Sequence, residues 1–161
     1  MAAGFAIGTT VALASQHWWK VRPSRPAKVR TTQAAPALAQ GHGMIIAINP
    51  NSGSATPATI AQIRSALPDA EIVELAPDGV LADVLDEIAG RAKALGVAGG
   101  DGTVAAAAAV AIEHDLPLAV FPAGTLNHFA ADVGISSIED VVAGIEAGEA
   151  VRVDVAEVGG I

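Results

Sequence analysis

From Met44 onward, hydrophobic and polar positions follow two alternating periods. Short apolar runs rich in branched residues recur along the chain as "MIIAIN", "AEIVEL", "LGVAG" and "LPLAVFP", and these runs predict four strands. Between them, apolar residues recur at intervals of three and four positions in "PATIAQIRSALP" and "GVLADVLDEIAGRAKAL", which predicts helices. Strands that alternate with helices predict an α/β fold, with a mostly parallel sheet and helices on both faces.

Further along the chain, the same patterns predict an alanine-rich helix after "GGDGT" and two more helices in "LNHFAADVG" and "SIEDVVAGIEAG". Residues 149–158, "EAVRVDVAEV", alternate valine with polar residues, as a half-buried strand does. We therefore expect an α/β domain over residues 44–148. We expect residues 149–161 to hold the first strand of a truncated second domain, for which no partner strands remain in the sequence.

The first 43 residues have a different pattern. Residues 1–15 carry no charge, and Trp18, Trp19 and five basic residues follow, an order typical of the end of a membrane span. Fifteen residues are fewer than the roughly 20 that a span needs, so a signal peptide or an apolar tail remains an alternative for residues 1–19. Residues 20–43 are rich in proline, alanine and basic residues, which predicts a tether.

Charge and composition narrow the classes of function. All 17 acidic residues but only four of the nine basic ones lie between residues 44 and 161, a net charge of −13 that opposes binding to nucleic acid. The chain has no cysteine, which excludes disulfides, thiol nucleophiles and cysteine-bound zinc. Aromatic residues make up only 3% of the chain, so small aliphatic side chains must form the core.

Three loops with unusual chemistry follow predicted strands: "NPNSGS" after the first, "GGDGT" after the third and "PAGTLNHFA" after the fourth. The carboxyl ends of parallel strands meet at one edge of a sheet, where ligands bind. Glycines in "GGDGT" would allow positive φ angles and close approach of a ligand. Successive backbone N–H groups and the start of the following helix would then face phosphate oxygens. Asp101 would orient the loop or reach a metal ion, and Thr103 would cap the helix or lie in its first turn.

Other phosphate-binding patterns are missing. The sequence contains neither G-x-x-x-x-G-K-[ST] nor a G-x-G-x-x-G after the first strand, and Lys93 is the only lysine after Met44. Backbone amides and Mg²⁺ would therefore have to hold phosphates. Taken singly, "GGDGT" is also compatible with a tight turn, and "NPNSGS" with an ordinary connection between a strand and a helix.

Taken together, the three loops resemble those of the nucleotide-binding domain of diacylglycerol kinases and related lipid kinases, a superfamily that includes sphingosine and NAD kinases. The resemblance covers about residues 44–158 and implies that the glycine-rich loop holds the phosphates of ATP. Asp101 is the expected catalytic residue, and His128 stands where the family commonly has aspartate. The implied nucleotide-binding residues are Asn49, Asn51, Ser52, Gly53, Gly99, Gly100, Asp101, Gly102, Thr103, Gly124, Thr125 and Asn127.

The resemblance implies an ATP- and Mg²⁺-dependent lipid kinase that transfers the γ-phosphoryl group to a lipid hydroxyl, with diacylglycerol as the expected substrate class. An NAD-kinase-like enzyme and a non-catalytic, membrane-tethered nucleotide-binding module are the alternatives. The expected location is the cytoplasmic face of a membrane, and the implied partners are a lipid, the membrane surface and a fused PAP2-type membrane phosphatase. In the family a second, mostly β domain follows and holds the general base, so we expect this chain to be a fragment without it.

Overall fold

The computed structural model describes residues 31–53, 55–76, 79–123, 130 and 133–153. The chain divides into two compact units, residues 1–30 and residues 31–161, and all described residues belong to the second. The expected membrane segment, residues 1–19, lies outside the described residues. Among the described helices, none has both the length and the hydropathy that a membrane crossing requires.

A four-stranded parallel sheet forms the centre of the fold. Its strands are Met44–Ile48 (β2), Glu71–Glu74 (β3), Ala94–Ala98 (β4) and Leu118–Phe121 (β5). They lie in the order β3-β2-β4-β5. Every residue of the central strands β2 and β4 is buried, because helices cover both faces of the sheet. The predicted α/β class and the four predicted strands are confirmed.

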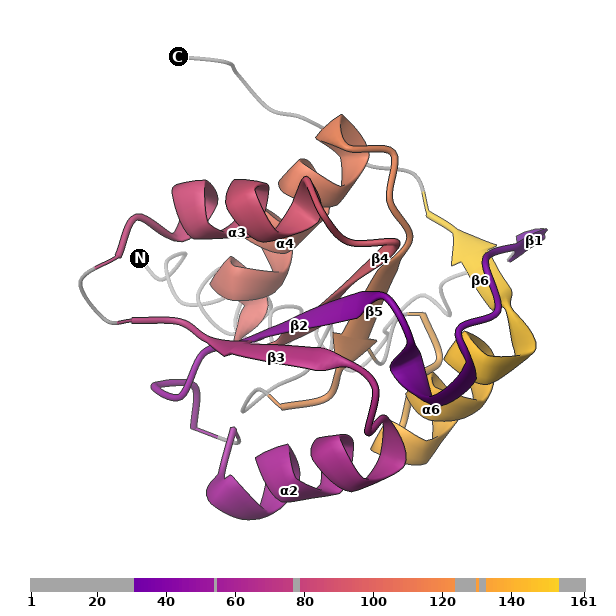
Figure 1. Cartoon of the computed structure of the whole chain (residues 1–161), viewed down its shortest axis with the longest axis horizontal. Helices are drawn as coiled ribbons and strands as arrows, with labels where there is room; N and C mark the ends of the chain where they lie inside the picture. Colours follow the sequence, from indigo (N-terminus) through magenta and orange to yellow (C-terminus); the bar gives the residue numbers. More distant parts are fainter. Residues whose placement is uncertain (1–30, 54, 77–78, 124–129, 131–132, 154–161) are drawn as a thin grey trace, which may run out of the picture. The chain divides into compact units, whose positions relative to one another are not determined.

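Helices form the outer layers, and Figure 1 shows them on both sides of the sheet. They are Pro57–Ala66 (α2), Leu81–Ala89 (α3), Asp101–Glu113 (α4) and Ile138–Ala147 (α6). Successive side chains of a strand point to opposite faces, so each strand contributes to two separate cores. Leu95 and Val97 pack with residues of α3 and α4, whereas Ala94 and Ala98 pack with residues of α2 and α6.

Local sequence explains most of the helix ends. Thr56 caps α2 by accepting a hydrogen bond from the Thr59 N–H, and Pro57 occupies the first helical position. A capping box of Ser137 and Asp140 starts α6. Helix α3 ends at Ala89, although apolar periodicity predicts a helix up to residue 95, because the backbone turns after Gly90 and enters β4 at residue 94.

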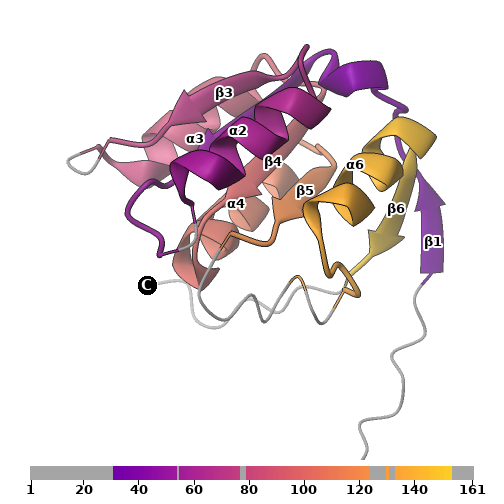
Figure 2. The same cartoon turned by 90° about the horizontal axis from the view of Figure 1, so that it is seen from below.

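Two expectations about the ends of the domain differ from the structure. Residues 31–43, expected as part of the tether, form the strand Thr31–Ala34 (β1) and the 3₁₀ turn Ala39–Gly41 (η1). Leu38, between them, is buried in the core beneath α6. The strand Glu149–Arg152 (β6) does have a partner in the preceding chain, because it pairs antiparallel with β1. Figure 2 shows this pair beside α6.

Candidate functional site

The carboxyl ends of β2, β4 and β5 bring the predicted loops to one edge of the sheet. The asparagine loop, residues 49–53, follows β2, and the glycine loop, residues 99–103, leads from β4 into α4. The Asn49 N–H donates to the Ala98 carbonyl oxygen at 2.9 Å. The pairing between β2 and β4 therefore continues one residue into the asparagine loop, and the two loops start side by side.

Asn49 connects these two loops through its side chain. Its Nδ2 donates to the Thr103 hydroxyl oxygen at 3.2 Å, and its Oδ1 accepts a hydrogen bond from the Asn51 N–H at 3.0 Å. Both ends of the amide are therefore used within the protein. Asn49 holds the asparagine loop against the first turn of α4, whereas the exposed Asn51 side chain stays available to a ligand.

The Ser52 side chain connects the asparagine loop to the residues that follow β5. Its hydroxyl donates to the Asn49 carbonyl oxygen at 2.8 Å and lies 3.3 Å from the carbonyl oxygen of Ala123. A hydroxyl carries one proton, so the shorter contact is the main hydrogen bond and the longer one is secondary. The contact with Ala123 was not predicted, because a backbone carbonyl leaves no signal in the sequence.

Gly99 is required by packing. A Cβ atom at this position would lie 2.8 Å from the Thr103 Cβ, so only glycine lets the first turn of α4 fold back onto the end of β4. Thr103 is 6% exposed, the only buried polar side chain among the described residues. Gly99, Gly100 and Gly102 do not have positive φ angles, so the expectation that the glycine loop uses left-handed backbone is wrong.

Gly100 and Gly102 have no such contact among the described residues. A Cβ atom at either position would meet no described atom within 4 Å. Gly100 is the N-cap of α4 and provides no side-chain cap, so the N–H groups of the first turn have no partner within the helix. Together with the positive end of the helix dipole, these donors form a cradle suited to an anion.

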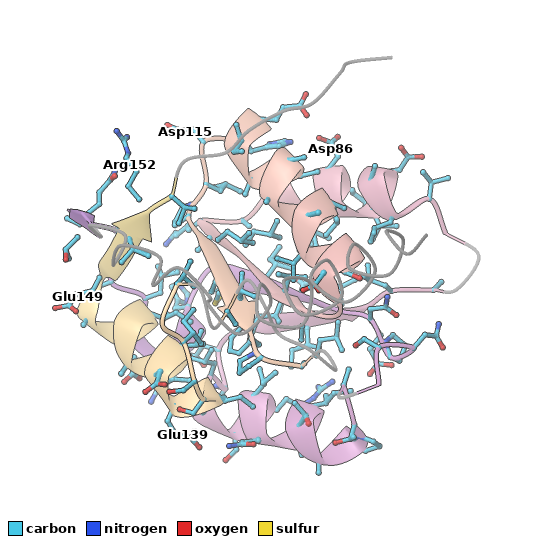
Figure 3. All side chains as sticks on the ribbon, turned by 180° about the vertical axis from the view of Figure 1, so that it is seen from behind. Asp86, Asp115, Glu139, Glu149 and Arg152 are labelled. Atoms are coloured by element: carbon cyan, nitrogen blue, oxygen red, sulfur yellow. The ribbon has the colours of Figure 1, made fainter. Side chains whose placement is uncertain are left out.

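The acidic side chain of this cradle is Asp101, exposed in the first turn of α4. Among the described residues there is no group of three or more His, Asp or Glu side chains able to hold a metal ion by itself. Figure 3 shows the labelled acids Asp86, Asp115, Glu139 and Glu149 spread over different elements. A Mg²⁺ ion commonly uses one or two carboxylates together with substrate phosphates, an arrangement that Asp101 fits.

The basic side chains of the domain lie elsewhere. Arg64 is in the last turn of α2, and Arg91 and Lys93 precede β4, so these three belong to the amino edge of the sheet. Arg152 ends β6. Among the described residues, these basic side chains therefore lie away from the glycine loop.

The third predicted loop lies largely outside the described residues. Gly124, Thr125, Asn127 and His128 belong to that segment, as does most of the predicted helix over residues 126–134. Of this loop the structure describes Pro122 and Ala123, which follow β5 at the same edge. The asparagine and glycine loops thus form the described part of the site.

Comparison with known proteins identifies what the chain resembles. The diacylglycerol kinase catalytic domain family matches residues 43–158. Similar solved structures include three from Bacillus anthracis str. Sterne, one described as a diacylglycerol kinase and two as candidate diacylglycerol kinases. They have TM-scores of 0.52, 0.52 and 0.51 at 23%, 23% and 24% identity. Each match covers 65% of this chain and 40% of the other. No curated protein matches the chain.

Proposed function

The chain belongs to the diacylglycerol kinase catalytic domain family, and we propose from this premise that residues 44–148 bind ATP for a lipid kinase. The family assignment indicates a kinase-like function at a general level. The finer proposal is transfer of the γ-phosphoryl group of ATP to the hydroxyl of a lipid of the diacylglycerol class. The chain spans about two fifths of the length of the solved relatives, so this activity is proposed for the whole protein to which the domain contributes.

The observation that carries the proposal is the cradle at the carboxyl edge. Gly100 and Gly102 leave the space over the start of α4 free of described atoms, and the N–H groups of that turn have no partner within the helix. A phosphate chain lying there would accept hydrogen bonds from the backbone and meet the positive end of α4. Backbone N–H groups are the available phosphate donors here, because the described lysine and arginine side chains lie away from the glycine loop.

The residues around the cradle have separate roles in this proposal. In this proposal Thr103 contributes its backbone N–H to the ligand, while Asn49, which donates to the buried Thr103 hydroxyl, keeps the turn in place. Asp101 would hold Mg²⁺ against the phosphates. When bound, ATP supplies the phosphoryl group and Mg²⁺ neutralises its charge. The membrane surface at the cytoplasmic face is the proposed location of the lipid.

Substitution of Gly100 tests the cradle. Gly100→Val places a branched side chain into the open space, so we expect loss of ATP binding in isothermal calorimetry while the circular dichroism spectrum stays unchanged. Gly90→Val is the matched control, because Gly90 is exposed at the end of α3 and its Cβ would meet nothing closer than 3.7 Å. Unchanged ATP affinity in folded Gly100→Val would refute the site.

The acceptor is tested with labelled ATP, Mg²⁺ and the longest form of the protein that its gene encodes. We expect phosphatidate from diacylglycerol micelles and no NADP from NAD. Asp101→Asn should reduce turnover more than ATP binding, because it removes a charge beside the proposed Mg²⁺ with little change of shape. Formation of NADP alone would favour an NAD-kinase-like enzyme, and tight ATP binding without any turnover would favour a non-catalytic module.

A further inference from the structure

A cavity lies at the edge of the sheet opposite the glycine loop. Its volume is about 420 Å³, within the usual range for small-molecule sites. It is formed where the chain enters β2, β3 and β4, so three separate loops contribute to it. The strands between the two edges are five residues long, or roughly 16 Å. The lining residues are Ala37, Leu38, Ala39, Gln40, His42, Asp69 and Lys93.

Lys93 is the main charge in this cavity. It is the only lysine after Met44, and it makes no ion pair with any carboxylate of the described residues. The aliphatic part of the Lys93 side chain lies against Gly43, where a Cβ atom would be 2.8 Å from the Lys93 Cδ. The backbone N–H of Lys93 donates to the Gly43 carbonyl oxygen at 2.9 Å. In a domain with a large excess of acids, the exposed Lys93 side chain thus lines this cavity without an ion pair among the described residues.

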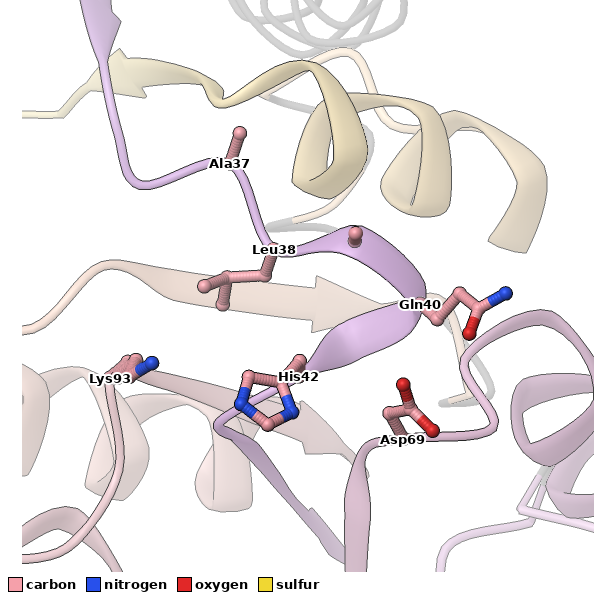
Figure 4. A pocket seen from close by; sticks show the side chains of 7 residues that line it. Ala37, Leu38, Gln40, His42, Asp69 and Lys93 are labelled. Atoms are coloured by element: carbon pink, nitrogen blue, oxygen red, sulfur yellow. The ribbon is translucent and has the colours of Figure 1, made fainter.

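Two further polar side chains of the cavity also lack partners. Neither the His42 imidazole nor the Asp69 carboxylate makes a hydrogen bond or ion pair within the described residues. Figure 4 shows the His42 ring between the ends of Lys93 and Asp69, with Leu38 on the apolar side. The cavity therefore offers hydrogen-bond donors from Lys93 and His42 and an acceptor from Asp69, with the His42 ring between the other two side chains.

We propose that this cavity binds a phosphate group that carries a hydroxyl a few bonds away. Lys93 and His42 donate to the phosphate oxygens, since a phosphate has enough acceptors for both. Asp69 accepts a hydrogen bond from the hydroxyl. A bare phosphate ion fits less well, because the Asp69 carboxylate repels it and gains no hydrogen bond from it. A glycerol phosphate has the required chemistry, either in solution or as the headgroup of a phospholipid.

This site is independent of the proposed kinase activity, because no residue of the asparagine or glycine loop lines it. It is tested by nuclear magnetic resonance titration of the full 161-residue chain with sn-glycerol 3-phosphate and, separately, with inorganic phosphate. The amides of Gly41, Gly43 and Lys93 report on the cavity, and those of Gly100 and Gly102 report on the glycine loop. We expect saturable shifts at the first set with glycerol 3-phosphate.

Three variants separate specific binding from general attraction. Lys93→Gln removes a charge-assisted hydrogen bond and should weaken glycerol 3-phosphate binding about tenfold or more. Arg64→Gln removes the same charge from an exposed residue at the same edge and should change affinity less than about twofold. Asp69→Asn should weaken glycerol 3-phosphate but strengthen inorganic phosphate, because it removes a repulsive charge.

Vesicles of phosphatidylcholine with and without phosphatidylglycerol distinguish the two sources of the ligand. If the cavity takes a lipid headgroup, Lys93→Gln lowers binding to vesicles that contain phosphatidylglycerol and Arg64→Gln does not. If it takes a soluble ester, only the titration in solution responds to Lys93→Gln. Absence of saturable binding to both probes, or equal weakening by Lys93→Gln and Arg64→Gln, would overturn the proposal.

Discussion

At the scale of single residues, the contact between Asn49 and Thr103 is the link that gives the candidate site its shape. The two side chains come from loops 54 positions apart and meet at 3.2 Å. Each end of the Asn49 amide makes one hydrogen bond within the protein, so Asn49 fixes the two loops relative to each other. A residue of this kind acts by holding the first turn of α4 where its N–H groups converge.

A double-mutant cycle measures this link. Asn49→Ala and Thr103→Val each remove it, so we expect their losses of unfolding free energy to be non-additive by about 0.5–1.5 kcal/mol. Thr103→Ser keeps the acceptor oxygen and should keep most of the coupling. Urea unfolding of the four proteins gives the value. Additive losses would mean that the hydrogen bond does not connect the loops.

The glycines of the glycine loop should respond differently to the same substitution. Gly99→Ala forces Thr103 away and should lower the free energy of unfolding by about 1–3 kcal/mol. Gly100→Ala meets no described atom and should lower the free energy of unfolding by less than about 1 kcal/mol, the cost of an alanine at the N-cap of α4. Thermal unfolding compares the two variants, and a similar loss for both would contradict the packing explanation for Gly99.

At the scale of whole elements, α6 depends on a charged cap. The Ser136 hydroxyl, the N–H groups of residues 136 and 137 and the Ser137 hydroxyl lower the pKa of Asp140 below its ordinary value of 3.8. The folded state thus favours the carboxylate. This stabilisation is complete above the ordinary pKa and disappears as the pH falls through the lower pKa of the folded protein.

Asp140→Asn isolates this contribution, because asparagine keeps an acceptor oxygen but does not titrate. Wild type should be more stable than the variant at pH 7, and the difference should shrink as the pH falls below 4 and vanish once Asp140 is protonated. Chemical unfolding from pH 7 to pH 2 provides the measurement. A difference that does not change with pH would show that the charge of Asp140 is not responsible.

The elements that could be predicted are those whose burial follows a local period. Strands β2 and β4 are apolar throughout because both faces are covered, and α6 carries its own start signal in Ser137 and Asp140. Strand β1, with the sequence TTQA, has no apolar alternation. It is a strand because β6 lies beside it, and pairing between distant segments leaves no local pattern.

At the scale of the whole molecule, charge should control how nucleotides approach. Residues 44–161 contain four basic and 17 acidic residues, a net charge of −13. The domain therefore repels the negatively charged complex of ATP with Mg²⁺ over long distances. Raising the salt concentration screens this repulsion. We therefore expect faster ATP association in stopped-flow measurements at 300 mM than at 30 mM NaCl. The neutral nucleoside adenosine should show little change, and slower ATP association at high salt would contradict this view.

The two sites differ in how far the sequence could reveal them. The asparagine and glycine loops stand out as compact motifs after predicted strands, and a parallel sheet must bring such loops to one edge. The sequence does not show why each glycine is needed. At position 99 the reason is the contact that a Cβ atom would make with Thr103, and this contact depends on how α4 turns back onto β4. His42, Asp69 and Lys93 precede three different strands as isolated residues, so only their arrangement in space makes them a group.

The pairing of β1 with β6 brings the first and last described strands side by side. Thr31 lies opposite Arg152, so the polypeptide enters and leaves the domain at neighbouring points. A domain whose two described ends are neighbours in this way tolerates insertion into a loop of another protein. The same closeness makes it suited to circular permutation, in which a short linker joins these two ends and the chain is opened at an exposed loop.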